Sequence, residues 1–302
     1  MQNGKHLLVL TGPTASGKTA LAIELAKIFD TVIISADSRQ FYKEMQIGTA
    51  APTPEELVQV PHFLIHHKSI FETYDVADYE QDVLNLLDLL FEKHQIVILT
   101  GGSGLFIDAV CKGLDLIPSI SNETRKKVAD LLQNKGLKNL QKEVETIDPE
   151  YYNEVDRNNP RRLQRALEVY YQTGKKFSSF RNKQDKERNF NIIRTAILWE
   201  RSQLIKRINQ RVDSMIEAGL YEEAKTLYPY REQNALKTVG YQEIFNHFDG
   251  NCSFEEAIEQ IKTNTRRYAK RQMTWLRKNT DYQWFSLEAY QKIITYVNKI
   301  IF

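Results

Sequence analysis

The stretch LLVLTGPTASGKTALAIELAKIF, residues 7–29, determines the fold class. Its first four residues are all apolar, which predicts a short buried strand. Its last nine residues place apolar side chains at helical spacing. Residues 12–19, between these two segments, match the pattern G-x-x-x-x-G-K-[S/T]. A strand before this pattern and a helix after it are the context in which it forms a phosphate-binding P-loop.

The residue types in this loop explain how it can bind phosphate. Gly12 and Gly17 let the backbone turn tightly and direct N–H groups inward. The helix N-terminus adds a positive dipole end, Lys18 adds a mobile charge, and the Thr19 hydroxyl can bind Mg²⁺. The predicted phosphate-binding residues are Gly12, Pro13, Thr14, Ala15, Ser16, Gly17, Lys18 and Thr19. The loop alone does not distinguish ATP, GTP or another diphosphate ester.

Further strands and helices alternate along the first part of the chain. Residues 31–37 and 95–100 are apolar runs that predict buried strands, and residues 76–94 between them have a helical pattern. Residues 189–200 recover strand character. This alternation predicts a parallel α/β sheet of the P-loop NTPase type, with ligands at the carboxyl ends of its strands. The P-loop, Asp37 and the turn GGSG at residues 101–104 all fall at that edge.

Strand signals nearly stop between residues 119 and 188. Two short helices are predicted around Gly136, and another helix has Pro160 near its start and Gly174 near its end. We therefore predict a helical insert, residues 119–188, in an α/β core made of residues 1–118 and 189–302. The C-terminal part of that core is predicted to be helical over residues 201–227, 239–248 and 254–278.

Composition and charge restrict the class of protein. The chain has 302 residues, of which 42% are hydrophobic and 26% are charged, as in ordinary globular proteins. No apolar run approaches the ~20 residues of a membrane span, and no secretory signal is visible, so we expect a cytoplasmic protein without a membrane partner. Cys111 and Cys252 form no C-x-x-C pair, which argues against a disulfide framework or a cysteine zinc site.

The small net charge of +2 hides an uneven distribution. Residues 1–60 contain five basic and six acidic side chains, whereas residues 261–280 contain seven basic and no acidic ones. This asymmetry predicts a small anionic substrate near the P-loop and a larger polyanion elsewhere.

Three groups of residues each allow two interpretations. Asp37 ends a predicted strand, where it could accept a proton or bind Mg²⁺ through water, or could cap a helix. The turn at residues 101–104 could approach a ligand closely, with Ser103 as a hydroxyl donor, or be an ordinary tight turn. Basic residues with Tyr268 and Trp275 between them, in the segment 265–278, suit RNA phosphates and stacked bases, or form a solvated charged face.

A family resemblance combines these motifs. GPTASGKT, SADSRQFYKEMQIGTAAP, YDVADYEQD, TGGSGLF, NPRRLQRALEVY, VGYQE and KRQMTWLRK occur in this order. Together they resemble the bacterial tRNA dimethylallyltransferases of the tRNA isopentenyltransferase family, over roughly residues 6–280. The resemblance implies that the P-loop binds dimethylallyl diphosphate and not ATP. It also implies Mg²⁺-assisted transfer of the dimethylallyl group to N6 of adenosine 37, 3′ of the anticodon, in tRNAs reading codons that begin with U.

The resemblance assigns roles to individual residues. It implies three catalytic residues: Asp37, which orients the adenine amine and accepts its proton, Ser103, where the family more often has Thr, and Arg211, which matches a diphosphate contact. Thr19 would bind Mg²⁺. The implied tRNA contacts are Asp37, Ser38, Arg39, Gln40, Ser103, Arg125, Arg161, Arg162, Leu163, Gln164, Arg165, Val239, Gly240, Tyr241, Gln242, Lys270, Arg271, Gln272, Trp275 and Arg277.

The insert would correspond to the family's swinging arm, which closes on the tRNA anticodon stem-loop. Ala51 departs from the family pattern, because it replaces the usual lysine after IGTA. We also expect the protein to lack the zinc-finger extension of eukaryotic relatives. We expect a bacterial-type enzyme that acts as a monomer.

Three other functions share parts of this pattern. A P-loop small-molecule kinase would have the P-loop and Asp37 but no need for the acid-free basic segment. An adenylate prenyltransferase would use the same diphosphate with a free nucleotide as acceptor. An RNA-binding protein with a decayed P-loop is disfavoured by the intact Lys18, Thr19 and Asp37.

Overall fold

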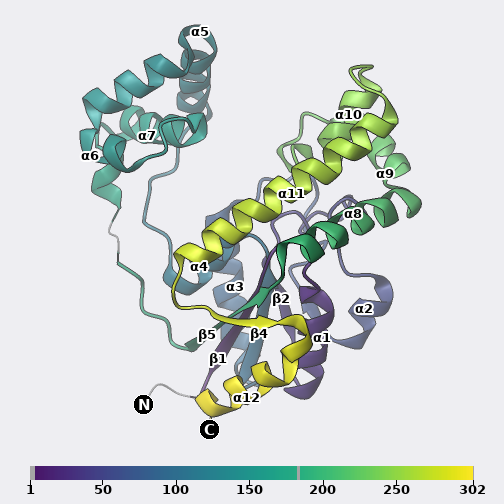
Figure 1. Ribbon diagram of the computed structural model, residues 1–302. Helices are drawn as coiled ribbons and strands as arrows, with labels where there is room; N and C mark the ends of the chain where they lie inside the picture. Colours follow the sequence, from purple (N-terminus) through teal and green to yellow (C-terminus); the bar gives the residue numbers. More distant parts are fainter. Residues whose placement is uncertain (1–3, 182–183, 302) are drawn as a thin grey trace. The chain divides into compact units, whose positions relative to one another are not determined.

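The computed structural model describes residues 4–181 and 184–301, which divide into two compact units (Figure 1). Unit 1 consists of Met1–Cys111 and Glu187–Phe302, and unit 2 consists of Lys112–Lys186. The predicted insert, residues 119–188, overlaps unit 2. Each unit has a hydrophobic core of its own.

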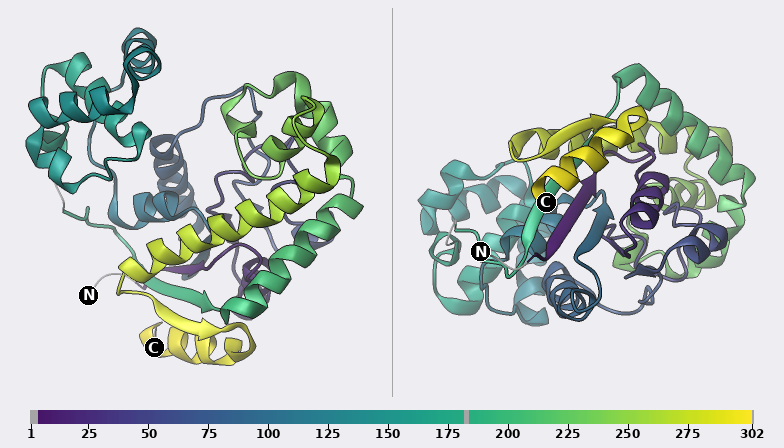
Figure 2. Two further views of the ribbon diagram at one scale, coloured as in Figure 1. Left: turned by 45° about the horizontal axis from the view of Figure 1, so that its top comes forward. Right: turned by 90° about the horizontal axis from the view of Figure 1, so that it is seen from below.

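Unit 1 is built around a parallel sheet (Figure 2). Its strand order is β3-β2-β4-β1-β5-β6. The six strands in the described residues are β1 His6–Thr11, β2 Ile33–Ser35, β3 His62–Phe63, β4 Ile96–Gly101, β5 Asn191–Leu198 and β6 Gln283–Ser286. The central strand β1 pairs Leu8 with Ile98 on one side and with Ile193 on the other. The parallel α/β sheet that the sequence predicts is therefore confirmed.

Helices pack on both faces of this sheet. The helices of unit 1 in the described residues are α1 Lys18–Ile28, α2 Pro54–Gln59, α3 Val76–Leu90, α4 Gly104–Lys112 (whose last residue, Lys112, belongs to unit 2), α8 Arg201–Glu217, α9 Leu220–Leu227, α10 Tyr241–Phe248, α11 Phe254–Lys278 and α12 Tyr290–Ile301. Short 3₁₀ turns cover Tyr228–Tyr230, Asn234–Leu236 and Leu287–Ala289.

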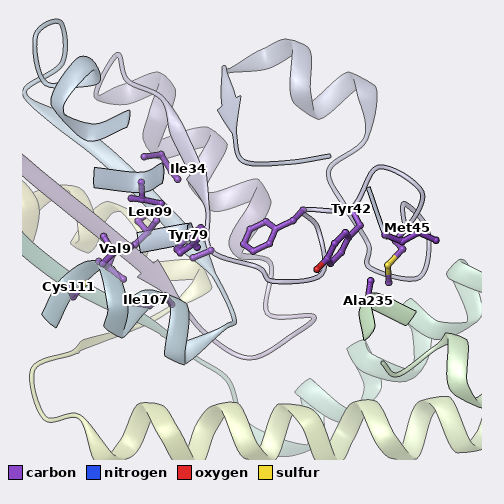
Figure 3. Packing of buried hydrophobic residues seen from close by; sticks show 14 of the residues in the cluster. Val9, Ile34, Tyr42, Met45, Tyr79, Leu99, Ile107, Cys111 and Ala235 are labelled. Carbon is purple, nitrogen blue, oxygen red and sulfur yellow. The ribbon is translucent and has the colours of Figure 1, made fainter. Parts of the chain in front are cut away.

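Alternate residues of each strand face different helices, as a sheet covered on both sides requires. Val9 and Leu99 lie in one core cluster with Tyr79 of α3 and Ile107 of α4 (Figure 3). Leu8, Leu10 and Ile98 lie in a second cluster with residues of α1 and α12. The sheet is thus fixed on both faces, and its carboxyl edge is the surface that remains for ligands.

A buried ion pair joins three parts of unit 1. The Arg188 guanidinium lies 2.6 Å from Glu80 of α3, with both side chains close to nine-tenths buried. The same guanidinium donates hydrogen bonds to the carbonyl oxygens of Val110 at 2.8 Å and Ala109 at 2.7 Å, at the end of α4. Arg188 therefore links α3, α4 and the segment that precedes β5.

Unit 2 in the described residues contains α5 Asn122–Ile147, α6 Pro149–Glu154, α7 Pro160–Thr173 and the 3₁₀ turn Phe177–Phe180. Gly136 has φ 74° and ψ 175°, which divides α5 into the two helices that the sequence predicts. Gly174 ends α7 in the left-handed region at φ 71°, as glycine does at many helix ends. Val128, Leu140 and Leu163 are among the residues of the core.

The sequence-based prediction was wrong or incomplete at several elements. Residues 201–227 are not one helix, because Gly219, at φ 100°, separates α8 from α9. The second strand covers Ile33–Ser35 and is shorter than predicted. The elements β3, β6, α2, α4, α6 and α12 were not predicted. Of these, β3 has two residues and β6 has four, too few for a clear alternating pattern.

Candidate functional site

The P-loop joins β1 to α1, as predicted. Gly17 takes a left-handed conformation, φ 84°, and is the residue from which α1 begins. The Lys18 ammonium donates a hydrogen bond to the carbonyl oxygen of Pro13 at 2.9 Å, so the side chain folds over the loop. The first N–H groups of α1 have no partner four residues earlier, which leaves them directed at a ligand position.

Side chains outside the loop bind its main chain. The Arg207 Nε–H of α8 donates to the carbonyl oxygen of Ala15 at 2.8 Å, and the indole N–H of Trp199 donates to that of Ser16 at 2.9 Å. The Arg207 guanidinium also lies over the Trp199 ring, 4.6 Å from its centroid. The P-loop conformation is therefore supported from its outer side before any ligand binds.

A cavity of about 390 Å³ lies beside the P-loop, at the carboxyl edge of the sheet. Residues from α8, α11 and three loops of unit 1 line it together with the P-loop. The lining residues are Thr14, Lys18, Thr19, Asp37, Ser38, Arg39, Gln40, Gly48, Thr49, Ala50, Thr100, Gly101, Arg211, Val212, Met215, Lys237, Thr238, Val239, Gly240, Gln242, Ile261, Thr265, Tyr268, Arg271 and Gln272. One cavity thus contains both the cationic P-loop residues and Asp37.

The charges in this cavity act on one another. Burial, and then the positive charge of Arg211, lowers the pKa of Lys18 to about 8, and the carboxylate of Asp37 opposes this shift. Burial also lowers the pKa of Arg211, whose guanidinium donates to the Thr14 hydroxyl at 3.3 Å. Two cations are therefore held close together in a desolvated site, an arrangement that an anion would stabilise.

Asp37 follows β2 in a turn. Its carboxylate accepts a hydrogen bond from the N–H of Arg39 at 3.1 Å, and its own N–H donates to the Ser35 hydroxyl at 3.3 Å. The alternative of a helix N-cap is wrong, because residues 37–40 form a turn and no helix. Asp37 is one of the residues that line the cavity.

The GGSG turn after β4 lies against Asp37's turn. The Ser103 hydroxyl accepts from the N–H of Ser38 at 3.0 Å and donates to the Ser38 hydroxyl at 3.1 Å. Burial, and then the negative charge of Asp37, raises the pKa of Tyr268 on α11 to about 12, and the Ser103 side chain opposes this shift. A Cβ on Gly101 would lie 2.2 Å from the carbonyl oxygen of Ala36, so this glycine allows β2 and β4 to end side by side.

Several basic residues of helix α11 are exposed. Lys270, Arg271 and Arg277 are exposed, whereas Gln272 is buried and Trp275 is half-buried, with its indole N–H donating to Asp108 at 3.0 Å. One of the seven basic residues in this region does have acidic partners: the Lys262 ammonium lies 2.9 Å from Asp213.

The VGYQE segment lies between the cavity and the core. Val239, Gly240 and Gln242 line the cavity, whereas Tyr241 is fully buried and donates its hydroxyl to Glu223 of α9 at 2.6 Å. A Cβ on Gly48 would lie 2.5 Å from the Tyr241 ring.

Glu223 fixes the loop that carries the IGTA motif. Its carboxylate accepts hydrogen bonds from the N–H groups of Gln46 at 3.0 Å, Ile47 at 2.8 Å and Gly48 at 2.9 Å. The loop that borders the cavity therefore depends on a carboxylate of α9, which comes 175 residues after Gly48 in the sequence.

The model of the IPP transferase family matches residues 40–279, most of the chain. The chain belongs to the IPP transferase family. It is similar to tRNA dimethylallyltransferase 1 of Bacteroides fragilis, with 47% identity over 98% of this chain and 99% of that protein. It is also similar to a tRNA dimethylallyltransferase of Christiangramia forsetii, with 50% identity over 96% of both proteins.

Solved structures resemble this IPP transferase along almost its whole length. The tRNA isopentenylpyrophosphate transferase of Bacillus halodurans has a TM-score of 0.74 and 35% identity, over 98% of this chain and 97% of that one. A eukaryotic dimethylallyltransferase acting on tRNA has a TM-score of 0.84 and 28% identity, over 98% of this chain and 79% of that one.

The remaining predicted tRNA contacts of this IPP transferase lie in unit 2. Arg125 on α5 and Arg161 and Arg162 on α7 are exposed. Leu163 is fully buried in the core of unit 2, and Gln164 and Arg165 are partly exposed. The arginines therefore offer cationic groups to solvent, whereas Leu163 has a packing role.

Sequence reasoning missed several residues of the site. Thr100, Val212, Met215 and Ile261 line the cavity but carry no motif of their own. Arg207 lies four residues before Arg211 on α8, so helical spacing was the signal that could have placed both on one face.

Two further properties concern the described residues as a whole. No group of three or more His, Cys, Asp or Glu side chains among them is arranged to bind a metal ion. No helix formed by them combines the length and apolar character that crossing a membrane requires.

Proposed function

We propose that this IPP transferase moves the dimethylallyl group from dimethylallyl diphosphate to N6 of adenosine 37 in tRNA and releases pyrophosphate. The observation that carries the proposal is the joint placement of Lys18, Arg211 and Asp37 around one cavity. Lys18 and Arg211 supply cations for the diphosphate, and Asp37 supplies a base for the adenine amine. The relatives named tRNA dimethylallyltransferase support the same substrates.

The diphosphate lies against the P-loop in this proposal. Its oxygens accept from the first N–H groups of α1 and from the side chains of Lys18 and Arg211. The bond between the allylic carbon and the diphosphate oxygen breaks, and the departing pyrophosphate takes the electron pair. Stabilising that anion with prearranged donors accounts for most of the rate enhancement expected of such a site.

The apolar part of the cavity receives the five-carbon group. Val212 and Met215 on α8, and Ile261 on α11, line the cavity together with Lys18 and Arg211. These side chains exclude water from the allylic carbon, which limits its hydrolysis.

Asp37 acts on the acceptor. The exocyclic amine of adenine is a weak nucleophile, and the carboxylate of Asp37 orients it toward the allylic carbon. As the new bond from N6 to carbon forms, the proton on N6 passes to Asp37. The Asp37 turn is held by Ser103 through Ser38, which gives Ser103 a positioning role at least.

Mg²⁺ fits the chemistry of this site. The hydroxyl of Thr19 and the carboxylate of Asp37 both line the cavity, and hard oxygen ligands of this type suit a magnesium ion that also binds substrate phosphates. When bound, the ion would neutralise charge on the leaving pyrophosphate. Thr19 would provide its protein ligand, and Asp37 would reach it through water.

The exposed basic residues suit the tRNA backbone. Arg267, Lys270, Arg271 and Arg277 on α11 are exposed, and Arg271 also lines the cavity; positive charge of this kind is what non-specific phosphate binding requires. The target base must leave the anticodon-loop stack to reach Asp37, as base-modifying enzymes require. The arginines of unit 2 would contribute further contacts to the anticodon stem-loop. We place the enzyme in the cytoplasm, acting as a monomer.

A label-transfer experiment tests the proposal. The protein is incubated with Mg²⁺, labelled dimethylallyl diphosphate and either an anticodon stem-loop with adenosine at position 37 or free AMP. A stem-loop with guanosine at position 37 is the matched control. Label in the adenosine-containing RNA alone is the expected result.

Two other outcomes would overturn the proposal. Label in AMP and not in RNA would make the protein an adenylate prenyltransferase. Label in neither acceptor, with loss of the γ-phosphate from ATP in a parallel reaction, would make it a small-molecule kinase.

A further inference from the structure

The buried amide of Gln272 joins two loops of the site. Gln272 lies on α11 and is 7% exposed. Its carbonyl oxygen accepts a hydrogen bond from the N–H of Thr14 in the P-loop at 2.8 Å. Its amide nitrogen donates to the carbonyl oxygen of Gly102, in the turn after β4, at 2.9 Å. Because both ends of the amide are used, its orientation is determined.

Glycines allow α11 to lie close enough for these bonds. A Cβ on Gly102 would lie 2.2 Å from the amide nitrogen of Gln272, and a Cβ on Gly104 would lie 2.4 Å from the Trp275 ring. A side chain at Gly102 would displace the amide of Gln272, and one at Gly104 would displace the Trp275 ring. Gly102 and Gly104 of the GGSG motif thus allow close packing of helix α11.

The bond to Thr14 acts on a P-loop segment with an unfavourable backbone conformation. Ala15, the next residue, has φ 62°, in the left-handed region that non-glycine residues rarely adopt. Gln272 binds the N–H of Thr14 on one side of Ala15, and Arg207 binds the carbonyl oxygen of Ala15 itself. External hydrogen bonds of this kind can maintain a strained conformation that the loop alone would leave.

We propose that Gln272 is a positioning residue that keeps the P-loop in its diphosphate-binding conformation. This role differs from the tRNA contact that the motif predicts for Gln272, because its carbonyl oxygen and amide nitrogen are already bound to main chain. The proposal rests on the proposed function in one respect, that the P-loop ligand is a diphosphate. Gln272 acts through Thr14 and Gly102, and not on the reacting atoms.

Pyrophosphate binding in the absence of RNA tests this role, measured by isothermal titration calorimetry on the full chain. Gln272→Met has a similar size but neither hydrogen bond, and we expect its pyrophosphate affinity to fall about 10-fold, a loss consistent with two buried hydrogen bonds. Lys270→Ala, on the exposed side of the same helix, is the contrasting variant. It should lose affinity for an anticodon stem-loop and keep the wild-type affinity for pyrophosphate.

A second variant gives a readout that loss of packing would not produce. Gln272→Glu keeps an acceptor for Thr14 but places a carboxylate oxygen against the carbonyl oxygen of Gly102. Protonation supplies an O–H donor to Gly102 and restores both bonds. The pyrophosphate affinity of Gln272→Glu, divided by that of the wild type at the same pH, should therefore rise as the pH falls from about 8 to about 6, because burial raises the pKa of such a carboxyl group.

Two results would overturn the positioning role. One is a Gln272→Met variant with wild-type pyrophosphate affinity and weakened RNA binding, which would make Gln272 a tRNA contact. The other is an affinity ratio for Gln272→Glu that does not change with pH, and this result decides the matter even if Gln272→Met does not fold. A wild-type protein that binds pyrophosphate but transfers no label would refute the proposed function and not the role of Gln272.

Discussion

The buried ammonium of Lys18 should make diphosphate binding depend on pH. Its pKa is lowered to about 8 in the ligand-free protein, first by burial and then by Arg211. A bound diphosphate brings negative charge and should move this pKa back toward its ordinary value of about 10.5. Binding then takes up a proton above about pH 8, and the affinity should fall roughly 10-fold for each further pH unit.

The assay is calorimetric titration with dimethylallyl diphosphate at about pH 7, about pH 8 and about pH 9. Repeating it in buffers with different ionisation enthalpies measures the protons taken up. Lys18→Arg is the matched control, because a guanidinium stays charged over this range. Dividing the wild-type affinity by that of Lys18→Arg removes the ionisation of the ligand, and this ratio should fall roughly 10-fold between about pH 7 and about pH 9.

The same pKa shift has the opposite effect on stability. Between about pH 8 and about pH 10.5 the unfolded chain holds the Lys18 proton and the folded chain does not. The contribution of Lys18 to the free energy of unfolding of the ligand-free protein therefore rises with pH in that window, while its contribution to binding falls. The reasoning on binding would be refuted if the dimethylallyl diphosphate affinities of wild type and Lys18→Arg changed in parallel from about pH 7 to about pH 9.

Three further variants have definite expected outcomes. Asp37→Asn should lower turnover by about 10²- to 10⁴-fold while changing dimethylallyl diphosphate affinity little, and comparable losses in both quantities would contradict its role as a base. Arg188→Met removes the guanidinium that lies 2.6 Å from the buried carboxylate of Glu80 and should cost about 3–5 kcal/mol in a urea unfolding titration; a loss below about 1 kcal/mol would show that the pair is effectively solvated. Gly48→Ala places a Cβ 2.5 Å from the Tyr241 ring and should reduce label transfer by displacing the IGTA loop. The double variant Gly48→Ala/Tyr241→Leu should partly restore label transfer.

The parts of the site that follow from local sequence were predictable. The P-loop needs only a strand, eight residues and a helix, so its pattern lies within one short stretch. Asp37 was identifiable as the end of a strand, and the turn that follows it excludes the helix N-cap interpretation.

The supports of the site were not predictable, because they join segments that are distant in the sequence. Gln272 meets Thr14 only after α11 has packed across the carboxyl edge of the sheet. Tyr241 and Glu223 similarly act on the loop at Gly48 from two other helices. Gln272 and Tyr241 both resemble ligand contacts in the sequence, but Gln272 uses its polar atoms on the protein main chain and Tyr241 donates its hydroxyl to Glu223.

The place of unit 2 in the chain determines the order in which the sheet can be completed. Strand β1 pairs with β5, and all of Lys112–Lys186 is synthesised between them. Unit 2 has its own core, so it can fold while β1 still has one free edge. Pairings this distant in sequence slow folding, since a long loop must close before they form. During synthesis the edge of the apolar strand β1 thus leaves its main-chain N–H and C=O groups unpaired until β5 emerges, and this is the interval in which chaperones would be most needed.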